Sequence, residues 1–253
     1  MAIARAELVA YLDEFLETSR FRDYAPNGLQ VEGRDAIQRV ATGVTASQRL
    51  LDAAVDWGAD AVLVHHGYFW KGESPALTGM KRRRIATLLG NDLNLFAYHL
   101  PLDAHPEVGN NARLGALLGI EGFEPLDPAD RGGVGNIGQL AQPEAISVLL
   151  ERLQALTGRD ALHVGDANAS VQRVAWCTGG AQGYIDAAVA AGAEVYITGE
   201  ASEQTVHTAR EEGIQFIAAG HHATERYGVQ ALGEHLAGRF GIEHRYFEMD
   251  NPV

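Results

Sequence analysis

Short apolar runs alternate along the whole chain with longer stretches whose apolar residues recur at helical spacing. Two of the apolar runs lie at 93–100 and 214–220, and two of the helical stretches lie at 5–19 and 143–158. Strands that are apolar throughout and alternate with helices are typical of parallel sheets buried on both faces. We therefore expect an α/β fold with mainly parallel sheets covered by helices.

The pattern contains an internal repeat, because residues 39–66 align without a gap with residues 173–200. Ten of the 28 aligned positions are identical. Each copy predicts a strand, a turn, a helix and a second strand, and the helix should end at Gly58 in one copy and Gly192 in the other. The repeat predicts two related α/β lobes.

We place the N-terminal lobe at 1–128 and the second lobe at 129–253. A polar, glycine-containing segment at 126–135 is the expected junction. The closing strands expected at 134–140 and 244–249 are candidates to cross between the lobes, so the boundary is approximate.

Side chains that commonly bind metals stand where the predicted strands end. The run "AVLVHH" ends in His65 and His66. Asp103 and His221 each follow another apolar run, and Glu225 lies one helical turn after His221. Functional groups collect at the carboxyl ends of parallel strands, so these five residues are the candidate metal ligands.

The donor set indicates two metal ions rather than one. A single catalytic ion needs about three protein ligands, whereas three imidazoles and two carboxylates suit two ions about 3.5–4 Å apart. Imidazole and carboxylate donors without thiolate favour zinc, iron, manganese or cobalt, and the sequence does not choose among them.

Most isolated histidines are better explained by ordinary packing or surface contacts. We accept this explanation for five of them, His105, His163, His207, His235 and His244. His222 should point away from the site if a helix has begun at His221, so we treat it as structural or as a support for a ligand. His99 precedes Asp103 by four residues and is the candidate for proton transfer or for orienting a ligand.

The second copy of the repeat replaces the histidine pair with Gly199 and Glu200 and carries a glycine-rich turn, "TGGAQG", at 178–183. Such a turn before a helix can present backbone N–H groups to a phosphate. The alternative is a tight turn that needs positive φ angles. The phosphate-binding candidates are Gly179, Gly180 and Gly183.

Six longer motifs resemble the NGG-interacting-factor-three-like family, also called GTP cyclohydrolase I type 2. They are "NGLQVEG" (27–33), "DAVLVHHGYFWKGESP" (60–75), "HLPLDAHPEVGNN" (99–111), "QRVAWCTGG" (172–180), "ITGEASEQTVH" (197–207) and "AAGHHATERYG" (218–228). The resemblance implies two α/β lobes, two divalent metal ions per chain and a hexameric ring. It also implies His65, His66, Asp103, His221 and Glu225 as the metal ligands. The family often has an aromatic-acidic pair before the asparagine of its first motif; this chain has "YAPNGLQ", so we assign Asn27 no catalytic role.

Composition limits the partners. The net charge is −13 at pH 7, which disfavours binding to nucleic acid, and the basic run at 81–84 is interpreted as a solvated helix face. The single cysteine, Cys177, fits a reducing compartment. The chain shows no apolar run of membrane-spanning length and no signal-peptide core at its N-terminus. We expect a cytoplasmic protein that acts on a small molecule and does not bind membranes.

Three functions remain open from the sequence. The first is a metal-dependent hydrolase, for which the resemblance suggests GTP ring opening. The second is a phosphoesterase acting on nucleotides or single-stranded nucleic acid. The third is a protein without enzymatic activity that holds metal or serves as a partner scaffold.

The hexameric ring implied by the resemblance is directly testable. Light scattering of the purified chain at micromolar concentration should give about six times the mass of one chain, 27.2 kDa. The exposed aromatics expected in "GYFW" (67–70) would then be tested as interface residues, although they could equally line the metal site. A monomer at this concentration would exclude the ring.

Overall fold

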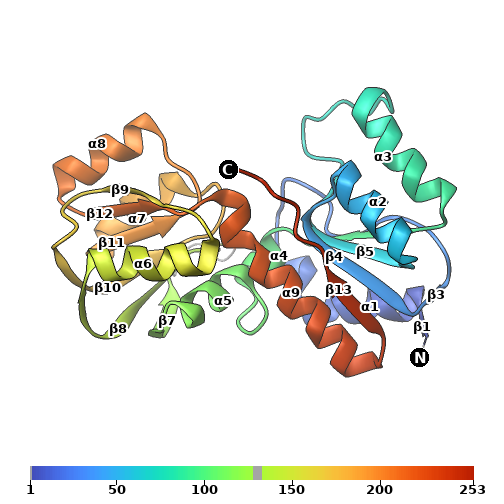
Figure 1. Cartoon of the computed structure of the whole chain (residues 1–253), viewed down its shortest axis with the longest axis horizontal. Helices are drawn as coiled ribbons and strands as arrows, with labels where there is room; N and C mark the ends of the chain where they lie inside the picture. The colour runs from blue at the N-terminus through green and yellow to red at the C-terminus, as the bar shows by residue number, and fades with distance from the viewer. Residues whose placement is uncertain (1, 128–132) are drawn as a thin grey trace. The chain divides into compact units, whose positions relative to one another are not determined.

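The computed structural model describes residues 2–127 and 133–253, and its residues cluster into two units, each built around one main sheet. Unit 1 comprises Met1–Gly109 and Gly228–Asp250, and unit 2 comprises Asn110–Tyr227 and Asn251–Val253. The α/β class expected from the sequence is confirmed. The units are drawn with their elements labelled in Figure 1.

Unit 1 contains a five-stranded sheet with the strand order β13-β4-β5-β6-β2. The strands β13, β4, β5 and β6 are parallel, and β2 runs antiparallel to β6 at the edge. The elements are β1 (Ile3–Ala4), α1 (Arg5–Phe15), the 3₁₀ turn η1 (Thr18–Arg20), β2 (Gly28–Val31), β3 (Ala36–Ile37), β4 (Arg39–Thr45), α2 (Gln48–Trp57), β5 (Ala61–His66), α3 (Gly79–Gly90), β6 (Asn94–Ala97), α4 (Leu100–Ala104) and β13 (Glu243–Tyr246), with most of α9 (His221–Phe240).

Helices cover both faces of this sheet because successive strand side chains point to opposite sides. In β5, Ala61 and Leu63 belong to the core that includes α1 and α9. Val62 and Val64 belong to the other core, with α2 and α3, which lie together on one side of the sheet in Figure 1. The sequence of β5 is apolar at successive positions, without alternation, because both faces of the strand are buried.

Unit 2 contains a six-stranded sheet with the order β7-β8-β10-β11-β12-β9. The three strands β10, β11 and β12 are parallel, whereas β7, β8 and β9 pair antiparallel, so this sheet is more mixed than the sequence pattern suggested. The elements are α5 (Asn110–Leu117), β7 (Ile120–Pro125), β8 (Asn136–Ala145), α6 (Ile146–Thr157), β9 (Leu162–Val164), β10 (Ser170–Trp176), the 3₁₀ turn η2 (Gln182–Tyr184), α7 (Ile185–Ala190), β11 (Val195–Thr198), α8 (Glu203–Glu212), β12 (Gln215–Ala218) and the first turns of α9.

The internal repeat corresponds to β4-α2-β5 in unit 1 and to β10-α7-β11 in unit 2, and both strand pairs are parallel. Gly58 and Gly192 follow the two helices with φ of 72° and 73°, a conformation that glycine adopts without strain. Helix α7 has six residues and α2 has ten. In the second copy the residues aligned with the first turn of α2 form the 3₁₀ turn η2, which contains Gly183, a poor helix former.

The units differ in their bounds from the expected lobes. The expected boundary between 128 and 129 falls in segment 128–132, which lies outside the described residues. Strand β13 pairs with β4 and so belongs to unit 1. The closing strand expected at 244–249 thus joins the sheet of the other unit, which is the crossing that the sequence allowed. Helix α5 belongs to unit 2, and its Leu114 packs in the core of that unit together with Leu118, which follows the helix.

Among the helices of residues 2–127 and 133–253, none combines the length and the apolar composition needed to cross a membrane.

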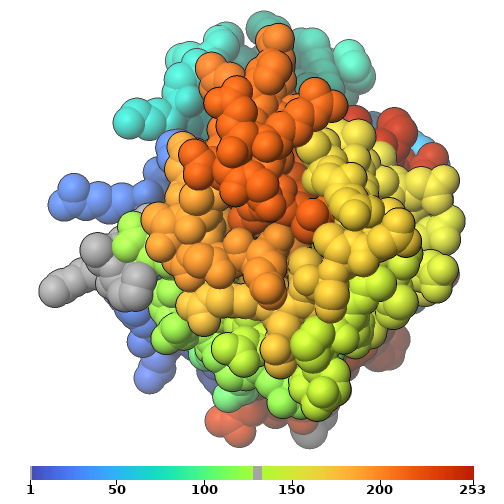
Figure 2. All heavy atoms as spheres, turned by 90° about the vertical axis from the view of Figure 1, so that its left-hand side faces the viewer, coloured from blue at the N-terminus to red at the C-terminus, as the bar shows by residue number. Residues whose placement is uncertain are grey.

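Figure 2 shows a surface of unit 2 on which the orange side chains of α8 protrude. His207 lies in α8 and is exposed.

We expect the stability of unit 1 to depend on pH through His244. Its imidazole hydrogen-bonds Thr42 Oγ1 at 2.8 Å, and burial lowers its pKa, although Glu234 acts in the opposite direction. The unfolded chain therefore binds a proton at a higher pH than the folded chain does. The contribution of His244 to the free energy of unfolding should be constant above about pH 7 and should become increasingly unfavourable as the pH decreases below about 6.5.

Urea denaturation of the metal-free protein at pH 7.5 and 5.5 would measure this effect. The variant His244→Gln should show a smaller loss of stability between the two pH values. Burial also lowers the pKa of His235, so part of the dependence should remain. His207→Gln is the matched control, since its exposed side chain changes environment little on folding. An unchanged pH dependence in His244→Gln would contradict the prediction.

Candidate metal centre

The candidate residues of unit 1 lie at the carboxyl ends of β5 and β6. These strands are parallel and in register, with Val64 opposite Ala97, so the residues that follow each strand emerge at the same edge of the sheet. His65 and His66 close β5, and His99 stands just before the short helix α4. Asp103 lies within α4 and is buried.

His65 is completely buried and has a defined orientation. Its Nδ1 lies 2.9 Å from the carbonyl oxygen of Tyr98, so Nδ1 carries the proton and donates it. Its Nε2 lies 3.5 Å from Asp103 Oδ1. A histidine fixed through Nδ1 presents Nε2 to a metal, as is common for metal ligands in proteins.

His66 is held in a similar way by a side chain of the neighbouring strand. Its Nδ1 lies 3.3 Å from Thr45 Oγ1 at the end of β4. Its ring centroid is 4.5 Å from that of His65 and 5.9 Å from that of Trp70. Trp70 thus forms a wall beside the imidazole, which agrees with the pocket-wall interpretation of "GYFW" for this residue. Tyr68, by contrast, is buried and donates its hydroxyl to the carbonyl of Ala46.

His99 is fixed by Asp23 and Asn27. Its Nδ1 donates to Asp23 Oδ1 at 2.7 Å, and its backbone N–H donates to Asn27 Oδ1 at 2.7 Å. Asp23 Oδ2 accepts from Asn27 Nδ2 and from the backbone N–H of Leu100, both at 2.9 Å. Burial raises the pKa of Asp23, but these hydrogen bonds and the imidazole outweigh it and lower the pKa to about 2. Asp23 is therefore a carboxylate at neutral pH.

These contacts bring three imidazoles of unit 1 into one group. One ring nitrogen from each of His65, His66 and His99 lies within 4.8 Å of the other two. The centroid of His99 is 5.1 Å from that of His65 and 5.7 Å from that of His66. The group fits a divalent ion that favours imidazole and carboxylate ligands.

In unit 2 the candidate residues His221 and Glu225 lie in the first turns of α9, directly after β12. His221 Nε2 is 3.2 Å from Glu225 Oε2, one helical turn away. His221 Nδ1 is 2.6 Å from Glu200 Oε1. Burial lowers the pKa of His221, but the hydrogen bonds to both carboxylates outweigh it and raise the pKa to about 9. A metal at Nε2 would take the place of that proton, while Glu200 keeps the ring oriented through Nδ1.

The glycine-rich turn of unit 2 lies against this pair. Gly179 has φ of 73°, and a Cβ there would overlap the carboxylate of Glu225. Its N–H donates to Thr224 Oγ1 at 3.0 Å. A Cβ at Gly180 would lie 3.4 Å from the His221 ring, whereas one at Gly183 would meet nothing within 4 Å. Gly179 thus makes room for a candidate ligand, and phosphate binding by this turn stays a prediction.

Three residues that orient the candidate ligands are not among those predicted from the sequence. Asp23 and Asn27 hold His99, although Asn27 was given no catalytic role because the motif around it is unusual. Glu200 holds His221, and the repeat contained a signal for it, since Glu200 occupies the position of His66 in the alignment.

The remaining histidines take part in ordinary contacts. His105 packs against Phe15 with tilted rings, His163 hydrogen-bonds Gln215, and His235 hydrogen-bonds Tyr11. His222 donates its backbone N–H to the carbonyl of Val253.

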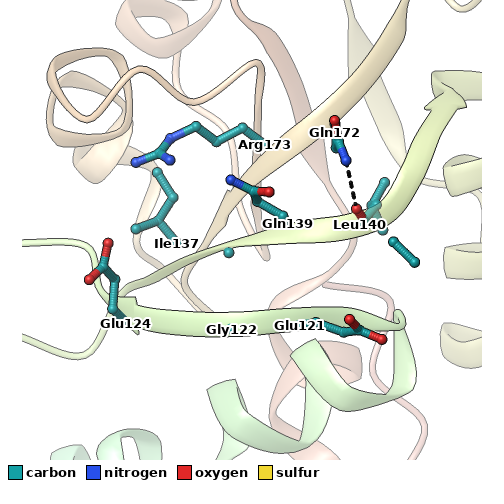
Figure 3. Close-up of a pocket in the computed structure, with 10 residues that line it drawn as sticks. Glu121, Gly122, Glu124, Ile137, Gln139, Leu140, Gln172 and Arg173 are labelled. Atoms are coloured by element: carbon teal, nitrogen blue, oxygen red, sulfur yellow. Dashed lines mark hydrogen bonds between the residues drawn. The ribbon is translucent and has the colours of Figure 1, made fainter.

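A separate pocket of unit 2 lies over β7, β8 and β10 and has a volume of about 480 Å³ (Figure 3). Glu121, Glu124 and Arg173 line it, and Gln172 Nε2 donates to the carbonyl of Leu140 at 3.2 Å. Its lining includes none of the candidate metal ligands. We therefore place the candidate chemistry at the strand ends and not in this pocket.

The fold and these donors define an α/β protein with candidate metal-binding side chains after the strands of each unit. The chain belongs to the Duf34/NIF3 (NGG1p interacting factor 3) family, whose sequence profile matches residues 3–252. The resemblance inferred from the sequence motifs is thus confirmed.

Individual relatives match all or nearly all of the chain. A protein of Pseudomonas aeruginosa named "GTP cyclohydrolase 1 type 2 homolog" is 59% identical over 253 residues, which is 100% of both chains. A protein of Escherichia coli K12 with the same name is 54% identical over 248 residues, 98% of each chain. A solved structure titled "protein ybgI, unknown function" is 52% identical, with a TM-score of 0.95 over 99% of this chain and 100% of that one.

The contact between Gly179 and Glu225 leads to a test of the turn. Gly179→Ala should weaken metal binding by about 10–100-fold, because the added Cβ displaces the Glu225 carboxylate. The φ of 73° adds a backbone cost of about 1 kcal/mol to the folded state. Affinity would be measured by competition with a chromophoric chelator, and folding by circular dichroism.

Gly183→Ala is the control from the same turn, and it should bind metal as the unchanged protein does. Gly179→Ala with unaltered metal affinity would show that the turn does not support Glu225.

Proposed function

We propose that the protein is a hydrolase that depends on two divalent metal ions held by His65, His66, Asp103, His221 and Glu225. The observation that carries this proposal is the way the three histidines of this set are held. Each has Nδ1 within hydrogen-bond distance of a protein oxygen, from Tyr98, Thr45 or Glu200, so that each offers Nε2. Such outer contacts orient metal ligands and increase their basicity.

The charge of the donor set supports two ions. Two carboxylates and three neutral imidazoles offset about half of the charge of two divalent ions, which leaves positive charge for water and an anionic substrate. Bound divalent metals lower the pKa of a coordinated water and polarise a substrate bond. In this proposal, Asp103 and Glu225 bind metal directly, and Glu200 holds the ring of His221.

A nucleotide is the first substrate to test. The relatives carry the name "GTP cyclohydrolase 1 type 2 homolog", which supports GTP ring opening as the reaction. Phosphate release from the same nucleotide would instead indicate a phosphoesterase. Metal binding with no turnover of any nucleotide would indicate a protein that holds or delivers metal. A hexameric ring and a cytoplasmic location also belong to the proposal, to be tested by light scattering and cell fractionation.

Elemental analysis of protein purified without chelator should find two metals per chain. His66→Ala and Glu225→Ala should each reduce this to one or fewer, and a nucleotide screen with the identified metal should show loss of turnover in both variants. The control is His207→Ala, whose exposed side chain on α8 lies outside the candidate set. His105→Ala is a poorer control, since this ring packs 4.4 Å from Phe15. Two metals retained in His66→Ala would refute the ligand assignment.

A further inference from the structure

Helix α3 presents an exposed surface that combines apolar and basic side chains and contains none of the candidate metal ligands. Leu77, just before the helix, is 49% exposed, and Met80 and Leu89 within it are 56% and 59% exposed. Arg82 and Arg83 are exposed on the same helix. These five residues are called the α3 surface, and α3 lies at the outside of unit 1 in Figure 1.

The opposite face of α3 fixes the orientation of this surface. Ile85 and Leu88 are buried in the core that α3 shares with α2. Positions seven residues apart on a helix share a face, so Arg82 and Leu89 lie on the same outward side, about 10 Å apart along the helix axis. The α3 surface thus has cations near the start of the helix and an apolar side chain near its end.

One member of the basic run at 81–84 is used by the fold itself. The side chain of Lys81 is only 11% exposed, its Nζ lies 3.2 Å from Glu73 Oε2, and the same atom stands 4.9 Å from the centre of the Phe69 ring. These contacts hold the preceding loop against α3. Arg82 and Arg83, by contrast, form no ion pair with any residue in the described ranges 2–127 and 133–253. The interpretation of the run as a solvated helix face therefore applies to these two arginines and not to Lys81.

The charges of α3 are placed against the dipole of the helix. Residues 69–90 contain five basic residues and one acidic residue, a net charge of +4 in a chain whose total is −13. The helix has no acidic residue in its first turn and no basic residue in its last turn, and its N-cap, Thr78, makes no side-chain hydrogen bond. Negative charge stabilises the start of a helix, so cations at this end weaken α3 in the free chain. An anionic group bound beside Arg82 and Arg83 removes this conflict, and conflicts of this kind are typical of functional surfaces.

We propose that the α3 surface docks an acidic amphipathic segment of another protein. Carboxylates of the partner pair with Arg82 and Arg83, and its apolar side chains cover Leu77, Met80 and Leu89. Exposed apolar groups rimmed by polar ones mark such interfaces. A nucleic acid fits less well, because its phosphates leave the three apolar side chains without a partner. This docking function is separate from the proposed metal-dependent activity and does not rest on it.

Fluorescence anisotropy of a labelled peptide tests this docking on the full chain. The probe is an acidic peptide of about 15 residues, roughly four helical turns, built of Glu, Ala and Leu with its leucines on one face. It should bind with an affinity that decreases as the salt concentration increases. Arg82→Glu/Arg83→Glu should weaken binding at least about 10-fold, and Met80→Ser/Leu89→Ser about 3–10-fold.

Two controls separate docking from a structural role and from an effect of net charge. Arg82→Glu/Arg83→Glu should leave the urea midpoint of unfolding unchanged or raise it, because carboxylates suit this end of the helix. Arg113→Glu/Arg210→Glu changes the net charge by the same amount at exposed positions of α5 and α8, and it should bind the peptide nearly as well as the unchanged chain does.

Loss of peptide binding in the α3 charge reversal alone, with the urea midpoint retained, supports the proposal. Equal binding by the two charge-reversed variants overturns it. Equal binding of a second peptide with the same composition, its leucines scattered around the helix, also overturns it, because charge alone would then explain the interaction. The proposal is equally wrong if the acidic peptide does not bind, or if only a single-stranded oligonucleotide or phosphatidylglycerol vesicles bind to this surface.

Discussion

The parallel pairing of β5 with β6 is the constraint on which the chemistry of unit 1 depends. It places the ends of two strands side by side, so that His65 and His66 at one end meet His99 and Asp103 after the other. The pairing is stabilised by two apolar cores, one on each face of the sheet. Because both faces are covered, the histidines have their positions set by the backbone of a buried strand, which makes a site more precise than one built on a mobile loop.

The two copies of the repeat share a backbone plan and differ in their chemistry. Where unit 1 has His66, unit 2 has Glu200, which binds the Nδ1 of His221. The repeat thus supplies an imidazole in one unit and, in the other, a carboxylate that holds an imidazole. The glycine turn of the second copy has a related consequence, since the missing side chain at Gly179 leaves space for Glu225. Duplicated folds can diverge in this way because strand pairing constrains the backbone but leaves the residues after each strand open to change.

Carboxylates serve two purposes near the candidate metal ligands. Asp103 and Glu225 approach the Nε2 side of histidines, at 3.5 and 3.2 Å, where a metal would bind. Asp23 and Glu200 approach the Nδ1 side, at 2.7 and 2.6 Å, where they fix the tautomer and the ring plane. Some of the acidic residues behind the net charge of −13 therefore orient imidazoles. These carboxylates support specific metal binding, in addition to the effect of net charge on solubility.

The sequence by itself determined the α/β class, the repeat, the helix ends at Gly58 and Gly192, and the strand ends that carry His65, His66 and His221. These features are encoded by local patterns of apolar residues and by glycine, whose effects act within a few residues. Only the tertiary structure showed that Asp23 binds a histidine 76 positions away, that β13 joins β4 across most of the chain, and that unit 2 adds antiparallel strands to its sheet. Such pairings depend on how whole elements pack, because a contact between distant residues is decided by the buried surface and hydrogen bonds of the complete unit and leaves no periodic trace in the sequence around either partner.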